Sequence, residues 1–551
     1  MYPLFLYTCG SKENLLYFRK MIQKFTQSRL NRWILTVLTG VLLTLSFPET
    51  GSLSWLSFVA WIPILAVESY FSNQKKSASM FLHAYVSFFI YNVGATWWIY
   101  HASAGGAYMA FFANSLLMAL TFLVFHRLKK KLSGNWTLAL LICAWLSFEF
   151  LHYNWELSWP WLNLGNVFAI HPTWVQWYAV TGVLGGTLWI LIVNYLFYKT
   201  LSKPSLKLKN NYLIAGLAVI LIPITFSYIT YFSKSISGKP YEVAVIQPNI
   251  DPYGEKFVLS NEEQLLSILN QADKVVTKNT KLVVAPETAL FPNGYIYEGN
   301  IRKEVFFHQI NEHRARWRNA GFLIGASTFQ LFDKKVSSVA YFQPQFNSFL
   351  EQYNSSILFD NTPNPKIIHK SKLVLGVEKI PFVNMFPFLE NWAVEMEGGS
   401  GSNGVEKEPK VFTKNQVSFA PVVCYESVYG EWVAKQTKLG AHFIAVITND
   451  GWWKDTPGYK QHFHFSRLRA IESNKYVVRS ANTGRSGIIN NRGDVVKQTA
   501  WWQKDAFTAT IQLNLDKTLY QQLGDFIGVF AVVGLISFYF MRLFYVLKRK
   551  K

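Results

Sequence analysis

Apolar residues form long runs in the first 235 residues of this chain and in its last 25, with ordinary mixed composition between them. Eight runs are close to the roughly 17–25 residues that a helix needs to cross the hydrocarbon core of a bilayer. The first and fifth are short enough to be partly re-entrant. The pattern predicts eight transmembrane helices, at residues 32–47, 54–72, 79–100, 105–127, 136–152, 174–199, 211–233 and 525–547.

The long segment between the seventh and eighth runs has a different period. Short β-branched runs alternate there with polar stretches of helical spacing, which is typical of an α/β layered domain. The predicted strands are 242–247, 281–285, 322–327, 355–359, 416–423, 443–448, 476–480, 486–490 and 506–513, and the predicted helices are 261–278, 306–319, 429–438 and 460–475. The Gly- and Ser-rich segment 396–404 predicts a flexible loop, a candidate lid.

These patterns divide the chain into five parts. They are an N-terminal segment (1–31), a transmembrane domain of seven spans (32–233), a soluble domain (234–524), a final transmembrane helix (525–547) and a basic tail (548–551). The first run is retained rather than cleaved, since Phe-Pro-Glu-Thr follows it in place of a small-residue cleavage site. Composition agrees, because only 16% of the residues are charged, against about 25% in soluble domains.

The net charge is +21, from 54 basic and 33 acidic residues. Such a balance can indicate nucleic acid binding. Here the basic residues lie beside apolar runs and in alternate loops, so they indicate membrane orientation and contact with anionic lipid instead. The basic positions are Arg19, Lys20, Lys24, Arg29, Arg32, Lys75, Lys76, Arg127, Lys129, Lys130, Lys131, Lys199, Lys203, Lys207, Lys209, Lys548, Arg549, Lys550 and Lys551. Both termini are therefore expected in the cytoplasm, with 234–524 outside.

The loop 153–173 is rich in tryptophan and tyrosine. Such side chains are typical of the headgroup level of a membrane, where a ring meets both hydrocarbon and water. The loop is either an ordinary aromatic belt or a lipid-facing lip beneath the outer domain.

Three predicted strands of the soluble domain end in residues that carry chemistry. Val-Val-Ala-Pro leads to Glu287, Phe-Ala-Pro-Val-Val leads to Cys424, and Ile-Ala-Val-Ile-Thr leads to Asn449. Sites in open α/β sheets gather outside the carboxyl ends of the strands. We therefore expect these three endings to converge.

Cys424 is the candidate nucleophile, since a thiolate attacks carbonyl carbon readily once a base or cation helps it form. Cys9 and Cys143 lie outside the soluble domain. An isolated cysteine in a strand is more often buried and inert. Glu287 is the candidate base, because a partly desolvated carboxylate gains basicity, although a loop glutamate is more often ordinary surface.

Lys370 is the candidate electrophile, as an ammonium beside a developing oxyanion stabilises it. Lys372 competes with it on spacing alone. No metal set is convincing, since His462 and His464 would point to different faces of one helix. No P-loop pattern and no Gly-x-Ser-x-Gly is present, so no cofactor and no metal is expected.

Taken together, Pro-Glu287-Thr-Ala, Lys370…Glu378-Lys-Ile-Pro and Cys424-Tyr425-Glu426 resemble the carbon–nitrogen hydrolase (nitrilase) superfamily. The membrane spans, the Trp-Pro-Trp-Leu loop and the closing span resemble its membrane-bound branch, the apolipoprotein N-acyltransferases of bacterial envelopes. The resemblance covers nearly the whole chain. It implies a nitrilase-like α-β-β-α sandwich carried by about eight transmembrane helices, in the bacterial inner membrane with the catalytic domain periplasmic.

The resemblance also implies roles for single residues. Glu287 matches the general base, Lys370 the oxyanion-stabilising lysine and Cys424 the nucleophile. The supporting carboxylates match Glu378 and Glu426, and the pocket residues match Tyr425, Asn449 and Trp452. The segment 383–410 corresponds to a loop that gates lipid entry. The segment from Lys370 to Glu378 departs from the family pattern, which has histidine at the position of Lys372, and also has a proline that is lost here.

The implied function is transfer of a fatty acyl chain from a phospholipid, through a Cys424 thioester, to the N-terminal amine of a diacylglyceryl-cysteine lipoprotein, with ping-pong kinetics. The expected partners are the phospholipid donor and the diacylated lipoprotein acceptor, without nucleic acid, and a monomer is the expected state. Two alternatives stay open. One is a membrane-tethered amidase or nitrilase that hydrolyses a soluble substrate. The other is a transporter or scaffold with a degenerate enzyme domain.

Overall fold

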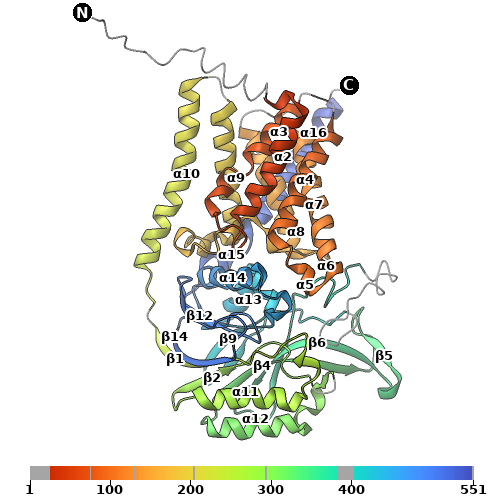
Figure 1. The fold of residues 1–551 in the computed structure, drawn as a ribbon, viewed down its shortest axis with the longest axis vertical. Coiled ribbons are helices and arrows are strands. Elements are labelled where there is room, and N and C mark those ends of the chain that lie inside the picture. The colour runs from red at the N-terminus through yellow and green to blue at the C-terminus, as the bar shows by residue number, and fades with distance from the viewer. Residues whose placement is uncertain are drawn as a thin grey trace, which may run out of the picture.

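The computed structural model describes residues 25–548, apart from 73, 75, 130–131, 133–134, 203–204, 237, 292–293 and 383–401. A bundle of long helices stands on one side of an α/β domain (Figure 1). Most of the predicted loop 396–404 and most of the predicted gate 383–410 lie outside the described residues. The same holds for Cys9 and for about half of the basic positions used to predict orientation.

All eight predicted spans are largely helical. The long helices are α2 (Arg29–Ser46), α3 (Ile62–Ser72), α4 (Ser77–Thr96), α7 (Asn114–Lys129), α8 (Asn135–Asn154), α9 (Tyr178–Ser202), α10 (Leu206–Ser233) and α16 (Phe526–Lys548). Short turns lead into two of them: η1 (Ser54–Phe58) precedes α3, while α5 (Ile99–Ala102), α6 (Ala104–Tyr108) and the π-helix η2 (Met109–Ala113) precede α7.

Six segments in the described part of the chain are long and apolar enough to cross a membrane: Ser54–Ser72, Ala104–Lys129, Trp136–Asn154, Tyr178–Ser202, Leu206–Ser233 and Phe526–Phe544. The two remaining predicted spans, α2 and α4, lie in the same bundle (Figure 1). They are less apolar because α2 carries Arg29 and Arg32 and α4 carries polar residues such as His83 and Asn92. By helix length and apolar composition, therefore, six of the eight predicted spans in the described residues qualify as membrane-crossing.

The aromatic loop after α8 returns into the bundle instead of lying on its surface. It forms three short 3-10 helices, η3 (Pro160–Leu162), η4 (Leu164–Phe168) and η5 (Pro172–Trp174). Trp161 and Leu164 are each 1% exposed. The Glu149 carboxylate seats the loop by accepting hydrogen bonds from Leu164 N (2.9 Å) and Thr187 Oγ1 (2.6 Å). The loop is therefore part of the core between the two domains.

The α/β domain contains two sheets packed face to face. The first has the order β14-β1-β2-β4-β6-β5, with β3 beside β4 and β7 beside β6, and the second has the order β13-β12-β11-β10-β9-β8. The strands of the first are β1 (Lys239–Gln247), β2 (Thr280–Val284), β3 (Ile296–Tyr297), β4 (Gly321–Phe332), β5 (Tyr341–Gln343), β6 (Ser348–Phe359), β7 (Lys366–His369) and β14 (Asp505–Leu513). Those of the second are β8 (Phe412–Lys414), β9 (Val417–Val423), β10 (Phe443–Thr448), β11 (Tyr476–Ala481), β12 (Gly487–Ile489) and β13 (Val495–Gln498).

Helices cover the outer face of each sheet, which makes the domain an α-β-β-α sandwich. Helices α11 (Asn261–Val275) and α12 (Val305–Arg316) cover the first sheet, and α13 (Gly430–Lys438) and α14 (Pro457–Ser473) cover the second (Figure 1). One apolar core lies between the sheets and includes Val243, Leu323 and Phe443. Two more lie under the helix pairs.

The second helix pair separates its sheet from the membrane bundle (Figure 1). On α14, Gln461 accepts a hydrogen bond from Trp161 Nε1 (2.8 Å) and donates to the Pro48 carbonyl (3.0 Å). Just before α13, Tyr429 OH lies 2.6 Å from Ser158 Oγ of the aromatic loop. The sandwich and the bundle are thus joined by buried polar contacts as well as by apolar packing.

Candidate active site

The carboxylate of Glu287 lies at the centre of a buried hydrogen-bond network. Its Oε1 accepts from Lys370 Nζ (3.0 Å) and from Asn354 Nδ2 (2.8 Å), and its Oε2 accepts from the Asn449 backbone N–H (3.1 Å). Glu287 follows β2 by three residues, in a tight passage beside Gly325, where an added Cβ would lie 2.5 Å from the Glu287 Cα. A glycine on β4 therefore lets the carboxylate reach the carboxyl edge of the sheet.

Lys370 is 1% exposed and contacts two carboxylates. Its Nζ donates to Glu378 Oε1 (2.8 Å) as well as to Glu287. Burial would lower the pKa of Lys370, but the two carboxylates raise it well above its ordinary value. An ammonium has three N–H donors, so one remains for a third acceptor.

Lys372 lies elsewhere. Its Nζ is 5.2 Å from the ring centre of Tyr429 and 5.5 Å from that of Trp432, positions typical of a cation over aromatic rings. Burial lowers the pKa of Lys372. Of the two lysines that the sequence left open, the fold brings Lys370 against Glu287.

Cys424 begins the 3-10 helix η10 (Cys424–Val428) directly after β9. Its φ of +50° is in the left-handed region, which non-glycine residues adopt only where the surrounding contacts enforce it. Burial and the nearby Glu287 raise the pKa of the Cys424 thiol well above its ordinary value, while Lys370 acts in the opposite direction. These surroundings favour the thiol over the thiolate.

Two further carboxylates support this arrangement. Glu378 accepts from Lys370, from Asn354 Nδ2 (2.8 Å) and from Val374 N (2.8 Å). Glu426 accepts from Ser371 N (2.6 Å) and Val423 N (2.8 Å), so it ties the residue after Lys370 to the residue before Cys424. Burial raises the pKa of Glu426 to about 7, against the effect of these N–H donors.

An apolar cavity leads from Cys424 into the membrane bundle. One wall comes from α5, α6, η2 and α7, a second from the aromatic loop, and a third from the segment after Lys370. The lining residues are Trp98, Ile99, Ala102, Ser103, Gly106, Met109, Ala110, Ala113, Asn114, Leu117, His152, Leu157, Trp159, Trp161, Val374, Leu375, Val377, Cys424, Tyr425 and Trp453. Most of these side chains are aliphatic or aromatic, which suits an acyl chain.

The three residues expected to shape the pocket differ in position. Tyr425 lines the cavity and stacks on Trp159 (ring centres 6.0 Å apart). Asn449 contributes its backbone N–H to Glu287. Trp452 does not line this cavity; its ring lies 5.5 Å from that of Tyr253, and Trp453, one residue on, takes the place in the lining. Both tryptophans belong to the 3-10 helix η11 (Asp450–Trp453), which ends before Lys454, a residue with a φ of +53°.

Asn354 is the main site residue that the sequence did not reveal. It lies inside β6, and its single amide nitrogen donates to both Glu287 and Glu378. An asparagine within a strand carries no local signal of such a role. The lining residues Trp98, His152 and Asn114 were missed for a similar reason, because they belong to membrane helices distant in sequence from the soluble domain.

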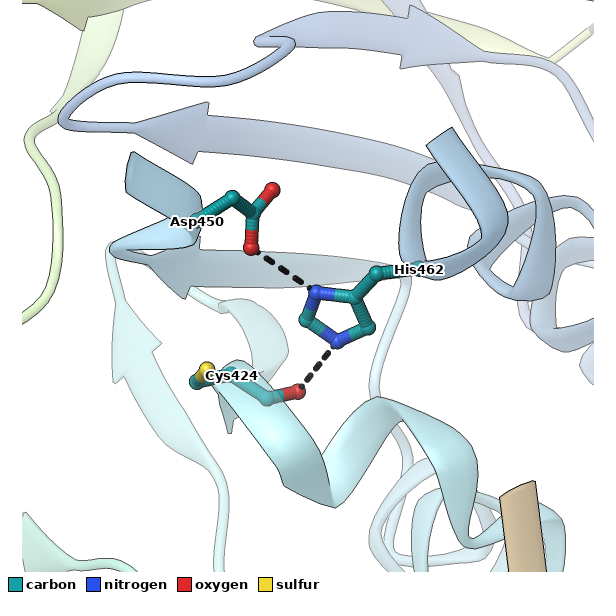
Figure 2. Close-up of side chains that lie close together, drawn as sticks. All are labelled: Cys424, Asp450 and His462. Carbon is teal, nitrogen blue, oxygen red and sulfur yellow. Dashed lines mark hydrogen bonds and ion pairs between the residues drawn. The ribbon is translucent and has the colours of Figure 1, made fainter. Parts of the chain in front are cut away.

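Among the described residues, Cys424, Asp450 and His462 form one group of possible metal ligands, with donor atoms within 4.8 Å of one another (Figure 2). Asp450 already pairs with Arg479 Nη2 (2.7 Å) and with His462 Nδ1 (2.9 Å). A metal ion here would meet the positive charge of a buried guanidinium. The donors are therefore better explained as a hydrogen-bond network.

The described end of the predicted gate packs beside the site. Asn403 N donates to the Glu378 carbonyl (2.9 Å), and Gly404 N donates to the Gln352 carbonyl (2.7 Å). This end of the segment is thus attached to β6 and to the lysine segment.

Comparison with known families gives two matches that together span most of the chain. Residues 39–196 match the model of the apolipoprotein N-acyltransferase N-terminal domain. Residues 242–519, slightly more than half of the chain, match the carbon-nitrogen hydrolase model.

Three curated relatives match along nearly their full length. An apolipoprotein N-acyltransferase of Chlorobaculum tepidum is 28% identical and is covered to 96%, with 92% of this chain aligned. Apolipoprotein N-acyltransferase 1 of Treponema denticola is 25% identical, covering 94% of this chain and 97% of its own length. The Haemophilus influenzae enzyme of the same name is 26% identical, covering 90% of this chain and 91% of its own.

Solved structures also match the soluble part. An amidase of the nitrilase superfamily from Nesterenkonia is 15% identical over 52% of this chain and 95% of its own, with a TM-score of 0.34. A nitrilase superfamily member from Saccharomyces cerevisiae is 15% identical over 53% of this chain and 97% of its own, with a TM-score of 0.35.

Proposed function

This chain belongs to the apolipoprotein N-acyltransferase family of carbon-nitrogen hydrolases, and on that premise we propose that it moves a fatty acyl chain from a membrane phospholipid, through a thioester on Cys424, to the N-terminal amine of a diacylglyceryl-cysteine lipoprotein. The observation that carries the proposal is the apolar cavity. Cys424 lines it together with residues of the membrane helices, so an acyl chain held there stays in apolar surroundings while its ester reaches the nucleophile.

In the first half-reaction the Cys424 sulfur attacks the ester carbonyl carbon of the phospholipid. Glu287 accepts the thiol proton, which the raised pKa of Cys424 makes necessary. The remaining N–H of Lys370 stabilises the oxyanion. The intermediate then collapses, the bond from carbon to the glycerol oxygen breaks, and that oxygen takes the proton from Glu287. A lysophospholipid leaves and a thioester remains.

In the second half-reaction the free amine of the acceptor attacks the thioester carbon. Glu287 accepts a proton from the amine, Lys370 again holds the oxyanion, and the carbon–sulfur bond breaks. The proton returns from Glu287 to Cys424, which restores the thiol and leaves an amide-linked third acyl chain. Because donor and acceptor use one site in turn, we expect ping-pong kinetics.

Glu378 and Glu426 act in this proposal by positioning. Glu378 holds the Lys370 ammonium and the Asn354 amide, so that neither group moves when Glu287 becomes protonated. Glu426 keeps the lysine segment and the Cys424 turn together through two backbone N–H groups.

We further propose that the catalytic domain is periplasmic and that both termini are cytoplasmic. The described basic residues support this orientation. They include Arg29 and Arg32 at the start of α2, Arg127 and Lys129 at the end of α7, and Lys548 at the end of α16. These helix ends lie on the side of the bundle away from the sandwich (Figure 1). Basic residues gather on the cytoplasmic side of membrane proteins.

The alternative of a soluble-substrate amidase uses the same three residues with water as acceptor. It gives no reason for the cavity to run between membrane helices. The transporter alternative expects charged groups along a path through the bundle. The buried Glu68 pairs instead with His126 and Lys129.

The first experiment is intact-mass analysis of the purified protein after incubation with a phosphatidylethanolamine of defined chains. We expect a single acyl increment, which a synthetic diacylated lipopeptide discharges as triacylated product. Cys424→Ala should abolish the increment. Cys143→Ala is the matched control, because Cys143 is a free cysteine on membrane helix α8, and it should keep the increment.

The outcomes separate the candidate functions. An increment discharged only by water indicates a lipid hydrolase. If the folded protein carries no increment on Cys424 but hydrolyses small amides, the soluble-substrate alternative replaces the proposal.

A further inference from the structure

We propose that His462, held by Asp450 and Arg479, is a positioning residue that fixes the Cys424 carbonyl and thereby the direction of the thiol. The inference rests on the proposed function for its assay but concerns residues with no role in the transfer chemistry above. The three side chains come from three elements. Asp450 follows β10 and His462 lies on α14 (Figure 2), and Arg479 lies on β11.

The contact to the nucleophile is made through its backbone. His462 Nε2 lies 3.0 Å from the Cys424 carbonyl oxygen, while the thiol points away from the ring (Figure 2). A carbonyl only accepts, so in this bond Nε2 carries the proton, and Ser427 Oγ also lies 2.8 Å from the same nitrogen. Ser427 Oγ donates to the same oxygen (2.8 Å). Two donors therefore converge on the one carbonyl whose residue has left-handed φ.

Two charged side chains contact the other nitrogen of the His462 ring. His462 Nδ1 lies 2.9 Å from both Asp450 Oδ1 and Arg479 Nη2. A neutral ring accepts from Arg479 and a charged ring donates to Asp450, so the pair orients the ring in either state. Asp450 also accepts from Thr448 Oγ1 (2.7 Å). Asp450, His462 and Arg479 are each 0% exposed, which leaves the network no freedom to turn into solvent.

Because the peptide bond is planar, the contact with the Cys424 carbonyl also orients the atoms next to it. In a trans peptide the C=O of Cys424 and the N–H of Tyr425 point in opposite directions. A carbonyl fixed toward His462 therefore directs the next N–H toward the opposite side, and it also holds the backbone from which the thiol projects. Without the histidine, the Cys424 backbone is free to relax toward ordinary φ, and the thiol then shifts relative to Glu287 and Lys370.

The test compares variants at His462 with a control on the same helix. His462→Leu keeps the volume but removes both nitrogens, and we expect its rate of acyl-enzyme formation to fall about 100-fold, the scale of a misplaced reacting group. The concentration of phospholipid giving half-maximal rate should be unchanged. His462→Gln, whose amide can donate to the carbonyl and accept from Arg479, should restore the rate to within about fivefold of wild type.

His464→Leu is the matched control, since His464 lies two residues on and pairs with Glu49 at 2.9 Å, away from the thiol. It should keep the wild-type rate. Ser427→Ala removes the second donor to the carbonyl, so Ser427→Ala and His462→Leu should be strongly non-additive in a double-mutant cycle. Ser427→Ala and His464→Leu should be additive.

A wild-type rate in His462→Leu would overturn the proposal. So would equal losses in His462→Leu and His462→Gln, because the carbonyl contact would then be irrelevant. If His462→Leu does not fold, a double-mutant cycle of His462→Gln and Ser427→Ala takes its place. Additive effects of these two substitutions on the rate of acyl-enzyme formation would count against the proposal.

Alkylation of Cys424 by a small neutral haloacetamide separates this inference from the proposed function. It needs no lipid, and His462→Leu should slow it at least about tenfold. A wild-type protein that is alkylated but never acylated refutes the proposed function alone. Unchanged alkylation in folded His462→Leu refutes the positioning role alone.

Discussion

At the scale of single residues, the proposed chemistry depends on how hydrogen-bond donors share the Glu287 carboxylate. One oxygen meets the N–H groups of Lys370 and Asn354, and the other meets the N–H of Asn449. These contacts hold the carboxylate in one orientation beside the Lys370 ammonium.

Glu287→Gln removes the base but keeps the shape. We expect the rate of acyl-enzyme formation to fall by about 10²- to 10⁴-fold, the usual contribution of a general base. Mass spectrometry at timed intervals measures it. Glu242→Gln, on β1 and bonded to Thr277 and Thr280, is the control and should behave as wild type. Retention of the wild-type rate in Glu287→Gln would exclude this base.

The two lysines should respond differently to the same replacement. Lys370→Met leaves Glu287 and Glu378 buried without their cation, which costs about 3–5 kcal/mol of unfolding free energy, and it abolishes acylation. Lys372→Met removes only a contact with two rings, worth about 0.5–1 kcal/mol. Unfolding midpoints and acylation rates of both variants make the comparison. The opposite ranking would mean that Lys372 is the electrophile.

The protonation state of the Cys424 thiol can be read from the pH dependence of its alkylation rate. Because burial and Glu287 raise the pKa of Cys424, the alkylation rate should still be rising with pH beyond about 9, above the ordinary cysteine pKa of about 8.5. Alkylation by a neutral haloacetamide between pH 6 and pH 10 measures this. A plateau below pH 8 would mean that the thiolate already exists at rest.

At the scale of elements, the aromatic loop depends on one buried carboxylate. Glu149 on α8 accepts hydrogen bonds from Leu164, Thr187 and Trp145. Through them it holds the loop that carries Trp159 and Trp161 into the cavity wall.

Glu149→Leu leaves those three donors without their acceptor. A buried donor without a hydrogen-bond partner lowers the free energy of unfolding by about 1–3 kcal/mol. We expect a lower thermal unfolding midpoint in detergent and a slower acylation rate. Glu156→Gln is the control at the exposed start of the same loop. This substitution breaks only the ion pair between Glu156 and Lys379, whose side chains are 47% and 32% exposed. Its effect on the free energy of unfolding should therefore stay within about 1 kcal/mol. An unchanged midpoint in Glu149→Leu would show that the loop is seated by apolar packing alone.

The elements of the sandwich were largely predictable, since the nine predicted strands and four predicted helices each correspond to an observed one. The missed strands were the short ones. Strands β3, β5, β7, β8 and β13 have two to four residues each. Such segments are too short for a period to be visible, and they exist because a neighbouring strand offers hydrogen bonds.

At the scale of the whole molecule, orientation is the property most open to test. Val258 is 82% exposed in the catalytic domain, and Lys207 lies at the far end of the bundle, in the first turn of α10. In a variant with Cys9 and Cys143 replaced, single cysteines at these positions should react differently with a membrane-impermeant maleimide. We expect labelling at 258 once the outer membrane is opened, and at 207 only after the inner membrane is lysed. The reverse pattern would invert the proposed topology.

The sequence by itself determined the division into membrane and soluble parts, because runs of hydrocarbon side chains are set by composition and length alone. It also determined the strand endings that carry Glu287, Cys424 and Asn449, since strand periodicity and local motifs are short-range features. The motifs around Glu287, Lys370 and Cys424 were enough to suggest the carbon–nitrogen hydrolase superfamily, and the membrane runs with the Trp-Pro-Trp-Leu loop narrowed it to the acyltransferase family.

Only the tertiary structure decided which groups meet. The geometry favours Lys370 over Lys372 because Lys370 Nζ contacts Glu287, whereas Lys372 Nζ lies over the ring of Tyr429. Asn354, Trp453 and His462 enter the site through sheet pairing and helix packing, which join residues that lie tens to hundreds of positions apart. The cavity exists only where two domains dock. Contacts of that kind depend on the whole fold, and no local pattern of residues encodes them.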